Sequence, residues 1–202
     1  ETQMIDSAAR TLDFAAARRA MIDSQLRTSG INDPAVLDRM GTVPREDFVP
    51  PAARGYCYMD RAIPLEDGGM LAPPPAHGMM LEEARPKKTD NALVVTNGSA
   101  YLAALLRPLV ASVETMSAAE AVAYKGRKSF DLVLVDGAIE HAPPALAKLV
   151  AEDGRLVTGL VDRGLPRLAL GRRSGRELAL LPIQDIALPR LPAFDKPKGW
   201  SF

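Results

Sequence analysis

Hydrophobic residues near the start of the chain recur at the three- and four-residue spacing of an amphipathic helix. Between residues 13 and 26 the recurring positions are Phe14, Ala17, Met21, Ile22 and Leu26. Gly30 is expected to end this helix, because glycine readily adopts the left-handed conformation that closes a helix. A second helix is expected from Asp33-Pro34, where a capping side chain precedes a proline in the first turn.

From residue 92 onward, short apolar runs alternate with helical patterns. The expected strands are 92–95, 110–114, 131–135 and 155–160, and the expected helices are 99–106, 117–124 and 143–150. Strands connected through helices in this way run parallel and are covered on both faces, so the pattern predicts an α/β, doubly wound, mostly parallel sheet. Residues 165–170 and 177–186 have the pattern of antiparallel strands.

The part between these two regions is less regular. Residues 51–75 are rich in proline and glycine, which predicts an irregular loop that wraps the core, and a helix is expected over 77–84. We therefore predict one domain over residues 1–202. It would consist of an N-terminal helical and loop region at 1–84 and a sheet region at 85–202.

The composition bears on which classes of partner to expect. The 202 residues hold 25 Lys plus Arg and 25 Asp plus Glu, so no overall charge draws the chain to nucleic acid. The longest apolar runs are shorter than the roughly 20 residues of a membrane span, so no membrane partner is expected. Cys57 is the single cysteine, which excludes an internal disulfide and fits a reducing cytoplasm. The first residues have no pattern of a secretory signal.

The stretch from Ala92 to Leu106 has the layout of a nucleotide-cofactor cradle: a buried strand, a glycine turn and a small-residue helix. A complete Gly-x-Gly-x-Gly pattern would place glycine at positions 96, 98 and 100. This chain has Thr96, Gly98 and Ala100. A β-branched residue at position 96 would cost about 1–2 kcal/mol if the turn needed a positive φ there.

Three motifs lie before residue 70. They are Arg19-x-Met-Ile-x-x-Gln25-Leu, Val43-Pro-Arg-Glu-x-Phe-Val-Pro50 and Tyr58-x-Asp-x-x-Ile-Pro-Leu65. In order and spacing they resemble the N-terminal half of the protein-L-isoaspartate O-methyltransferases, and the resemblance continues to about residue 160. It implies a Rossmann-like class I methyltransferase fold. It also implies a cytoplasmic repair enzyme that transfers a methyl group from S-adenosylmethionine to the carboxylate of isomerised aspartyl residues in damaged proteins.

The resemblance also assigns cofactor-binding positions. Gly98 and Ser99 would lie under the methionine moiety, and Glu114, expected at the end of the second strand, would accept hydrogen bonds from the ribose. His77 matches a histidine of some family members and would contact the cofactor carboxylate, or else pack against the loop as a structural residue. No residue is assigned to catalysis. With two distant histidines and one cysteine, no metal site is expected.

Other positions depart from the family. Ala72 replaces a serine expected at the reaction centre, and Ala100 adds a methyl group where the cofactor would approach. Only 16 residues, 115–130, separate Glu114 from Asp131, which is enough for one helix but not for a third strand with its own helices. One edge strand should therefore be missing, together with the turn that grips the adenine. The exposed second strand would then need a cover, such as a second copy in a homodimer.

Two hypotheses from different classes follow from this combination, and a methyltransferase with an altered substrate is a third that the sequence does not separate from them. The chain is either a divergent isoaspartyl methyltransferase or a catalytically impaired pseudo-methyltransferase that serves as a binding or assembly module without cofactor. The near-complete N-terminal motifs favour the first hypothesis. Thr96, Ala100, Ala72 and the missing strand favour the second.

Overall fold

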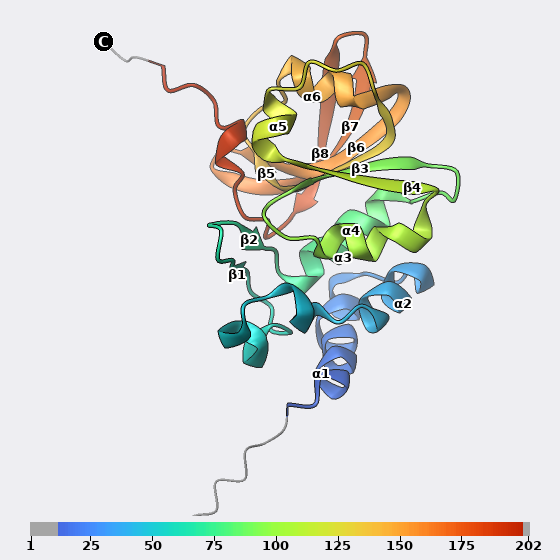
Figure 1. Ribbon diagram of the computed structural model, residues 1–202, viewed down its shortest axis with the longest axis vertical. Coiled ribbons are helices and arrows are strands. Elements are labelled where there is room, and N and C mark those ends of the chain that lie inside the picture. The colour runs from blue at the N-terminus through green and yellow to red at the C-terminus, as the bar shows by residue number, and fades with distance from the viewer. Residues whose placement is uncertain (1–11, 200–202) are drawn as a thin grey trace, which may run out of the picture.

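A six-stranded sheet organises the chain, and the computed structural model describes residues 12–199 (Figure 1). The strand order is β4-β3-β5-β6-β7-β8. Their bounds are β3 (Asn91–Thr96), β4 (Ser112–Ser117), β5 (Phe130–Ile139), β6 (Val150–Asp162), β7 (Leu165–Ser174) and β8 (Glu177–Asp185). The first four strands in this order run parallel, and β7 and β8 are antiparallel additions. The predicted doubly wound, mostly parallel sheet is confirmed.

The predicted loss of an edge strand is also confirmed. A single short helix, α5 (Ala118–Val122), connects β4 to β5. Within residues 12–199 no strand pairs with the outer side of β4. β4 is therefore an edge strand, and its burial reflects this, because none of its six residues is fully buried.

Helices cover both faces of the sheet (Figure 1). Their bounds are α1 (Phe14–Met21), α2 (Pro34–Thr42), α3 (Pro74–Ala84), α4 (Tyr101–Leu106) and α6 (Pro144–Leu149), besides α5. Because successive strand residues point to opposite faces, Val94 and Leu134 pack with the α1–α4 side. Val95 and Val133 pack with α5 and α6. No helix of the described chain is both long enough and apolar enough to cross a membrane.

In the N-terminal region α1 and α2 begin at the expected residues, whereas α3 begins at Pro74, ahead of the start expected at residue 77. The Asp13 carboxylate caps α1 by accepting from Ala16 N at 2.9 Å, and Asp33 caps α2 by accepting from Ala35 N at 2.8 Å. After α1 the chain widens into a π-helical turn and then tightens into a 3-10 turn before Gly30, whose φ is +83°. The predicted irregular loop contains one small antiparallel pair, β1 (Ile63–Pro64) and β2 (Met70–Leu71).

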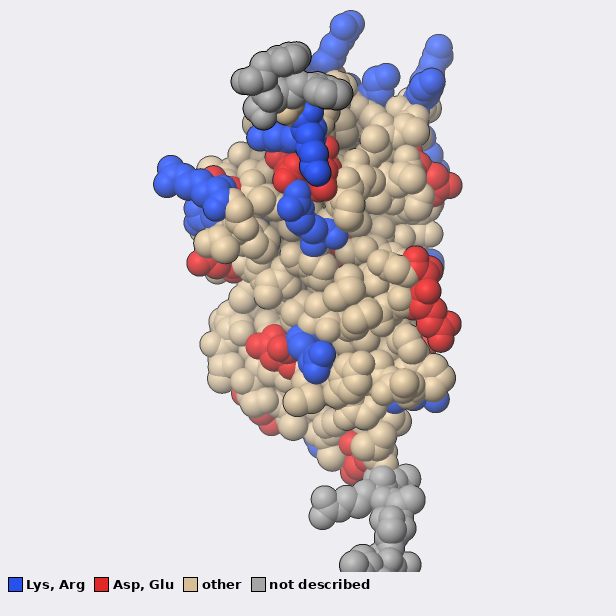
Figure 2. Space-filling view, turned by 90° about the vertical axis from the view of Figure 1, so that its left-hand side faces the viewer, with Lys and Arg blue, Asp and Glu red and all other residues tan. Residues whose placement is uncertain are grey.

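Charged side chains are unevenly spread over the face that Figure 2 shows. Lys and Arg side chains gather over its upper part, whereas Asp and Glu side chains are spread from the upper part to the lower end. The balanced composition therefore conceals a local concentration of positively charged side chains around the sheet region.

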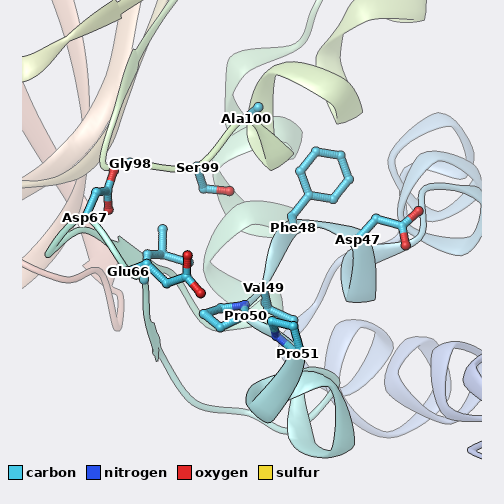
Figure 3. A pocket seen from close by; sticks show the side chains of 11 residues that line it. Asp47, Phe48, Val49, Pro50, Pro51, Glu66, Asp67, Gly98, Ser99 and Ala100 are labelled. Carbon is cyan, nitrogen blue, oxygen red and sulfur yellow. The ribbon is translucent and has the colours of Figure 1, made fainter.

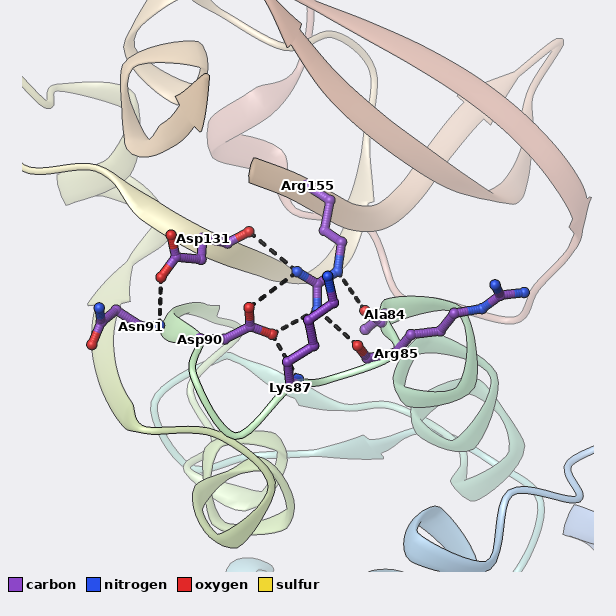
Figure 4. Close-up of polar contacts among 7 residues, drawn as sticks. All are labelled: Ala84, Arg85, Lys87, Asp90, Asn91, Asp131 and Arg155. Atoms are coloured by element: carbon purple, nitrogen blue, oxygen red, sulfur yellow. Dashed lines mark hydrogen bonds and ion pairs between the residues drawn. The ribbon is translucent and has the colours of Figure 1, made fainter. Parts of the chain in front are cut away.

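A buried arginine joins the elements near the amino ends of the central strands (Figure 4). Arg155 of β6 donates to the carbonyls of Ala84 at 2.6 Å and Arg85 at 2.8 Å, which end α3. Its guanidinium also pairs with Asp90 at 2.7 Å, directly before β3. Burial opposes ionisation of Asp90, but the hydrogen bonds from Arg155 and the Lys87 backbone outweigh it and hold the pKa of Asp90 below its usual value. This cluster fixes α3 against the sheet at the end opposite to the glycine turn.

We expect Arg155→Met to lower the free energy of unfolding by about 3–5 kcal/mol near neutral pH, because it leaves the Asp90 carboxylate buried without its partner. The pKa of Asp90 is lower in the folded state, so the pair's contribution is complete above the unfolded pKa of about 3.9 and fades as the pH falls through the folded value. Urea unfolding of both proteins from pH 7 downward measures this. Arg172→Met is the control, since Arg172 is exposed opposite Arg155 on β7. A loss independent of pH would contradict this account.

Candidate functional site

The turn after β3 has the backbone geometry of a ligand cradle. Gly98 adopts a φ of +84°, which favours glycine, and the Ser99 hydroxyl accepts from Tyr101 N at 3.1 Å where α4 begins. Among the described residues other than glycine, only Arg85 and Arg163 have a positive φ. Thr96 therefore fits its position at the end of β3 without the strain considered above.

A cavity of about 420 Å³ lies beside this turn (Figure 3). It is bounded by two of the three N-terminal motifs and by the turn itself. The lining residues are Asp47, Phe48, Val49, Pro50, Pro51, Leu65, Glu66, Asp67, Gly98, Ser99 and Ala100. The structure thus brings Gly98 and Ser99, which the sequence singled out, together with the Val43–Pro50 motif.

Three acidic residues line this cavity, and the sequence analysis did not identify them; the Asp47 carboxylate points away from Glu66 and Asp67 (Figure 3). Asp47 lies inside the Val43–Pro50 motif, whereas Glu66 and Asp67 directly follow the Tyr58–Leu65 motif. Their position within or next to those motifs was the available signal. No basic side chain is among the described residues that line the cavity, so its charge favours a cationic ligand group.

The loop before β2 lies in backbone contact with the glycine turn. Met70 N donates to the Asn97 carbonyl at 3.1 Å. A Cβ on Gly69 would lie only 2.3 Å from that same carbonyl oxygen, so glycine is needed for the approach. On the other side, a Cβ on Gly98 would lie 2.8 Å from both carboxylate oxygens of Asp67. Two glycines thus allow the loop to close against the turn.

A fully buried arginine supports this loop from beneath. Arg45 donates through Nε to the Cys57 carbonyl at 2.5 Å and through a terminal nitrogen to the Ala72 carbonyl at 2.7 Å. Its guanidinium lies 5.3 Å from the centre of the Tyr101 ring. Burial lowers the pKa of Arg45. Ala72, where the family's serine was expected, is itself fully buried and is positioned through its backbone.

A second polar network joins α1 to the same motifs. The Tyr58 hydroxyl donates to the Glu46 carboxylate, and Arg18 donates to Glu46 at 2.8 Å and to the Tyr58 oxygen at 2.8 Å. Burial opposes ionisation of Glu46, yet the hydrogen bonds outweigh it and the pKa of Glu46 lies below its usual value. Burial and the bond to Glu46 raise the pKa of Tyr58, which keeps the phenol protonated as a donor.

His77 lies away from the cavity. Its side chain is fully buried on α3, and Nε2 contacts Oδ1 of the equally buried Asp136 on β5 at 2.8 Å. The ring also packs 5.6 Å from Tyr101. The structure therefore pairs His77 with Asp136 and buries its ring away from solvent.

The expectation that Glu114 ends the second strand is wrong. β4 runs to Ser117, and the backbone register places Glu114 opposite Leu93 in the middle of the pair, whereas Ser117 lies opposite Thr96 beside the turn. The Glu114 carboxylate is exposed and pairs with Lys128. Ser117 instead caps α5 by accepting from Glu120 N at 3.2 Å. The end of β4 was inferred from the apolar run of the sequence. Pairing with β3 extends the strand beyond that run.

We expect Gly69→Ala to lower the free energy of unfolding by about 1–3 kcal/mol, because the added methyl group forces the loop away from the Asn97 carbonyl. Gly55→Ala is the matched control, since a Cβ there meets nothing within 4 Å, and it should change stability by less than about 0.5 kcal/mol. Urea unfolding compares the two variants. Equal stability of both would contradict the close approach.

The thiol of Cys57 should be unreactive in the folded protein. It is fully buried, and burial raises the pKa of Cys57 to about 11, so little thiolate exists at neutral pH. We expect a disulfide reagent at pH 8 to label Cys57 only after unfolding in urea, with labelling followed by absorbance. Rapid stoichiometric labelling of the native chain would contradict the buried position.

Comparison with known proteins identifies relatives of this chain. The sequence model of the family described as protein-L-isoaspartate(D-aspartate) O-methyltransferase (PCMT) matches residues 16–124. A protein-L-isoaspartate O-methyltransferase of Roseiflexus sp. (strain RS-1) is 34% identical, over 87% of this chain and 91% of its own length. One from Koribacter versatilis (strain Ellin345) is 32% identical, over 85% and 89%.

Solved structures share the fold. A protein-L-isoaspartate O-methyltransferase from Plasmodium falciparum, crystallised in complex with S-adenosyl-L-homocysteine, superimposes with a TM-score of 0.69. It is 16% identical, and the match covers 90% of this chain and 99% of that one. The family model and the relatives, which span most of the sequence, agree with the fold and with the motifs around the cavity. The chain therefore belongs to the protein-L-isoaspartate(D-aspartate) O-methyltransferase family.

Proposed function

We propose that this protein transfers a methyl group from S-adenosylmethionine to the carboxylate of isoaspartyl residues in damaged proteins. The observation that carries the proposal is the cavity at which the family motifs and the glycine turn meet. Relatives that match most of the chain are named for this activity. The free, buried Cys57 fits a reducing compartment, and we propose the cytoplasm as the site of action.

The reaction makes modest demands on side-chain chemistry. A carboxylate is already ionised near neutral pH, so it needs no general base before it attacks a methyl group. Catalysis then rests mainly on placing the two reactants in line and within reach of each other. The rigid loop held by Arg45, and the turn against which it closes, would supply that placement.

The residues at the turn fit the cofactor. When bound, S-adenosylmethionine supplies an activated methyl group on a positively charged sulfur. Gly98 offers a turn without a Cβ, and Gly98 and Ser99 both line the cavity, so we assign the cofactor contact to this pair. Glu66 and Asp67 give the cavity the negative charge that suits a cationic sulfonium. His77 would act indirectly by holding Asp136. Glu114 lies in the middle of β4, short of the strand end beside the turn, so no contact is assigned to it.

A second candidate function is that of a binding or assembly module without cofactor. Ser117 favours this function. It occupies the end of β4, where an acidic residue could accept hydrogen bonds from a ribose. Loss of that acceptor, together with the missing strand, removes contacts on the adenosine side. The two candidates differ in one measurable property, which is methyl transfer.

We expect the full chain to transfer methyl groups to a peptide that contains isoaspartate and not to the same peptide with ordinary aspartate. The methyl ester would be measured as methanol released by base. Ala100→Phe should lower the rate at least about tenfold, because the exposed Ala100 lines the cavity and the larger ring would fill it.

Gly55→Ala serves as the control and should keep the parent rate, since Gly55 lies outside the cavity lining. Equal rates for Ala100→Phe and the parent chain would contradict the assignment of the reaction to this cavity. No transfer to the isoaspartyl peptide, with the chain folded by circular dichroism, would favour the binding module instead.

A further inference from the structure

The glycine turn carries no charge of its own. Residues 91–100, which form β3 and the turn, include no Asp, Glu, Lys, Arg or His. The polar side chains that the turn offers are those of Thr96, Asn97 and Ser99. A charged group of a ligand that lies across Gly98 must therefore find its partner on another element of the structure.

The loop before β2 supplies a carboxylate at this point. A Cβ built on Gly98 would lie 2.8 Å from Oδ1 and 2.8 Å from Oδ2 of Asp67, so both oxygens face the turn. Figure 3 shows the Asp67 side chain beside Gly98, at the cavity that both residues line. A ligand that contacts Gly98 from the cavity therefore meets this carboxylate.

The backbone of the loop holds Asp67 in place and leaves one of its oxygens open. Gly69 N donates to Oδ1 of Asp67 at 3.0 Å, and Met70 N ties the loop to the Asn97 carbonyl. Within residues 12–199, Oδ2 accepts no hydrogen bond and no ion pair includes Asp67. Since both oxygens of an ionised carboxylate accept hydrogen bonds, Oδ2 remains available to a cationic donor.

The cofactor of the proposed reaction carries two cationic groups, which differ in what they offer a carboxylate. A sulfonium has no N–H or O–H group, so it interacts with a carboxylate through charge alone. An ammonium has three N–H donors, and its hydrogen bond to a carboxylate is about twice as strong as one between neutral groups. The open oxygen of Asp67 therefore favours the ammonium of the amino-acid end over the sulfonium.

The amino-acid end also carries a carboxylate, and the groups around the turn favour one orientation. Asp67 repels a second negative charge. The Ser99 hydroxyl accepts from Tyr101 N at 3.1 Å, and its own proton remains to donate. Ser99 and Asp67 both line the cavity, so a donor and an acceptor are present at the turn. This arrangement fits a zwitterion with its ammonium toward Asp67.

We propose that Asp67 binds the ammonium group of S-adenosylmethionine and thereby selects ligands that carry the amino-acid end. This inference rests on the proposed function. Oδ2 takes the ammonium while Oδ1 keeps its bond to Gly69 N, so the loop need not rearrange. The sulfonium is then left to the general negative charge of the cavity, to which Glu66 contributes.

The test compares two ligands with a neutral sulfur, each titrated by calorimetry into the full chain. S-adenosylhomocysteine has the ammonium, whereas 5′-methylthioadenosine lacks the whole amino-acid end. We expect Asp67→Asn to raise the Kd of S-adenosylhomocysteine about tenfold, because the amide keeps an acceptor for Gly69 N but loses the charge. The Kd of 5′-methylthioadenosine should stay within about twofold of the parent value.

Asp47→Asn is the matched control. Asp47 lines the same cavity, but its carboxylate points away from Asp67 (Figure 3). The same change of charge at this position should alter the Kd of either ligand by less than about twofold. Urea unfolding of both variants checks that a loss of affinity is not a loss of fold.

A second measurement needs no variant. The analogue of S-adenosylhomocysteine in which hydrogen replaces the ammonium should bind the parent chain about tenfold more weakly than S-adenosylhomocysteine itself. In Asp67→Asn, the two ligands should bind with similar Kd values, because the partner of the ammonium is gone. Equal binding of both ligands by the parent chain would overturn the contact.

The outcomes separate the role of Asp67 from the proposed function. An unchanged or lower Kd of S-adenosylhomocysteine in Asp67→Asn would overturn the contact, while binding by the parent chain leaves the proposed function standing. An equal loss for 5′-methylthioadenosine would also overturn it, since the effect would then come from the loop. An equal loss in Asp47→Asn would show a general effect of charge and have the same consequence. Absence of S-adenosylhomocysteine binding by the parent chain and by every variant would overturn both proposals.

Discussion

The buried guanidinium of Arg45 is the interaction on which the site depends most. Taking a cation out of water costs several kcal/mol unless its donors find partners. Among the ion pairs of residues 12–199, none involves Arg45, so two backbone carbonyls and an aromatic ring provide the compensation, while Nη1 has no hydrogen-bond partner among the described residues. Those partners belong to three separate segments, at Cys57, Ala72 and Tyr101. The requirement for partners around one buried charge thereby brings together the loop at Cys57, the segment just before α3 and the helix after the glycine turn.

The strand ends of the sheet are held in two different ways. Near the amino ends, Arg155 pairs with Asp90 and binds the last carbonyls of α3, which gives a closed and fully paired cluster. At the carboxyl ends, the contacts are glycine-mediated backbone approaches at Gly69, Gly98 and Gly137. Backbone contacts of this kind leave space beside them, and the cavity lies there. A fold that must admit ligands is suited by a rigid cluster at the amino ends of its strands and by backbone contacts that leave space at the carboxyl ends.

Sequence patterns predicted the sheet and the missing strand well because both follow from local periodicity and from chain length between strands. The position of Glu114 was set wrongly because β4 is an edge strand with little burial, and its pairing with β3 decided where it ended. The Asp136 partner of His77 lies 59 positions away, a separation that no local pattern bridges. The pairing of residues 189–191 with β5 was not predicted either. The prolines of this segment gave no strand periodicity, and only the free edge of β5 defined its conformation.

The exposed position of β4 shows how a sheet of this kind can lose a strand. Each inner strand donates and accepts hydrogen bonds on both sides, so its removal would leave two rows of polar groups unpaired. Removal of an outermost strand uncovers only one row, and here the pair between Lys128 and Glu114 places charge over that row. Evolutionary trimming of such folds can therefore proceed inward from this margin with little harm to the remainder. In the described part of this chain, β4 is the strand that now forms this margin.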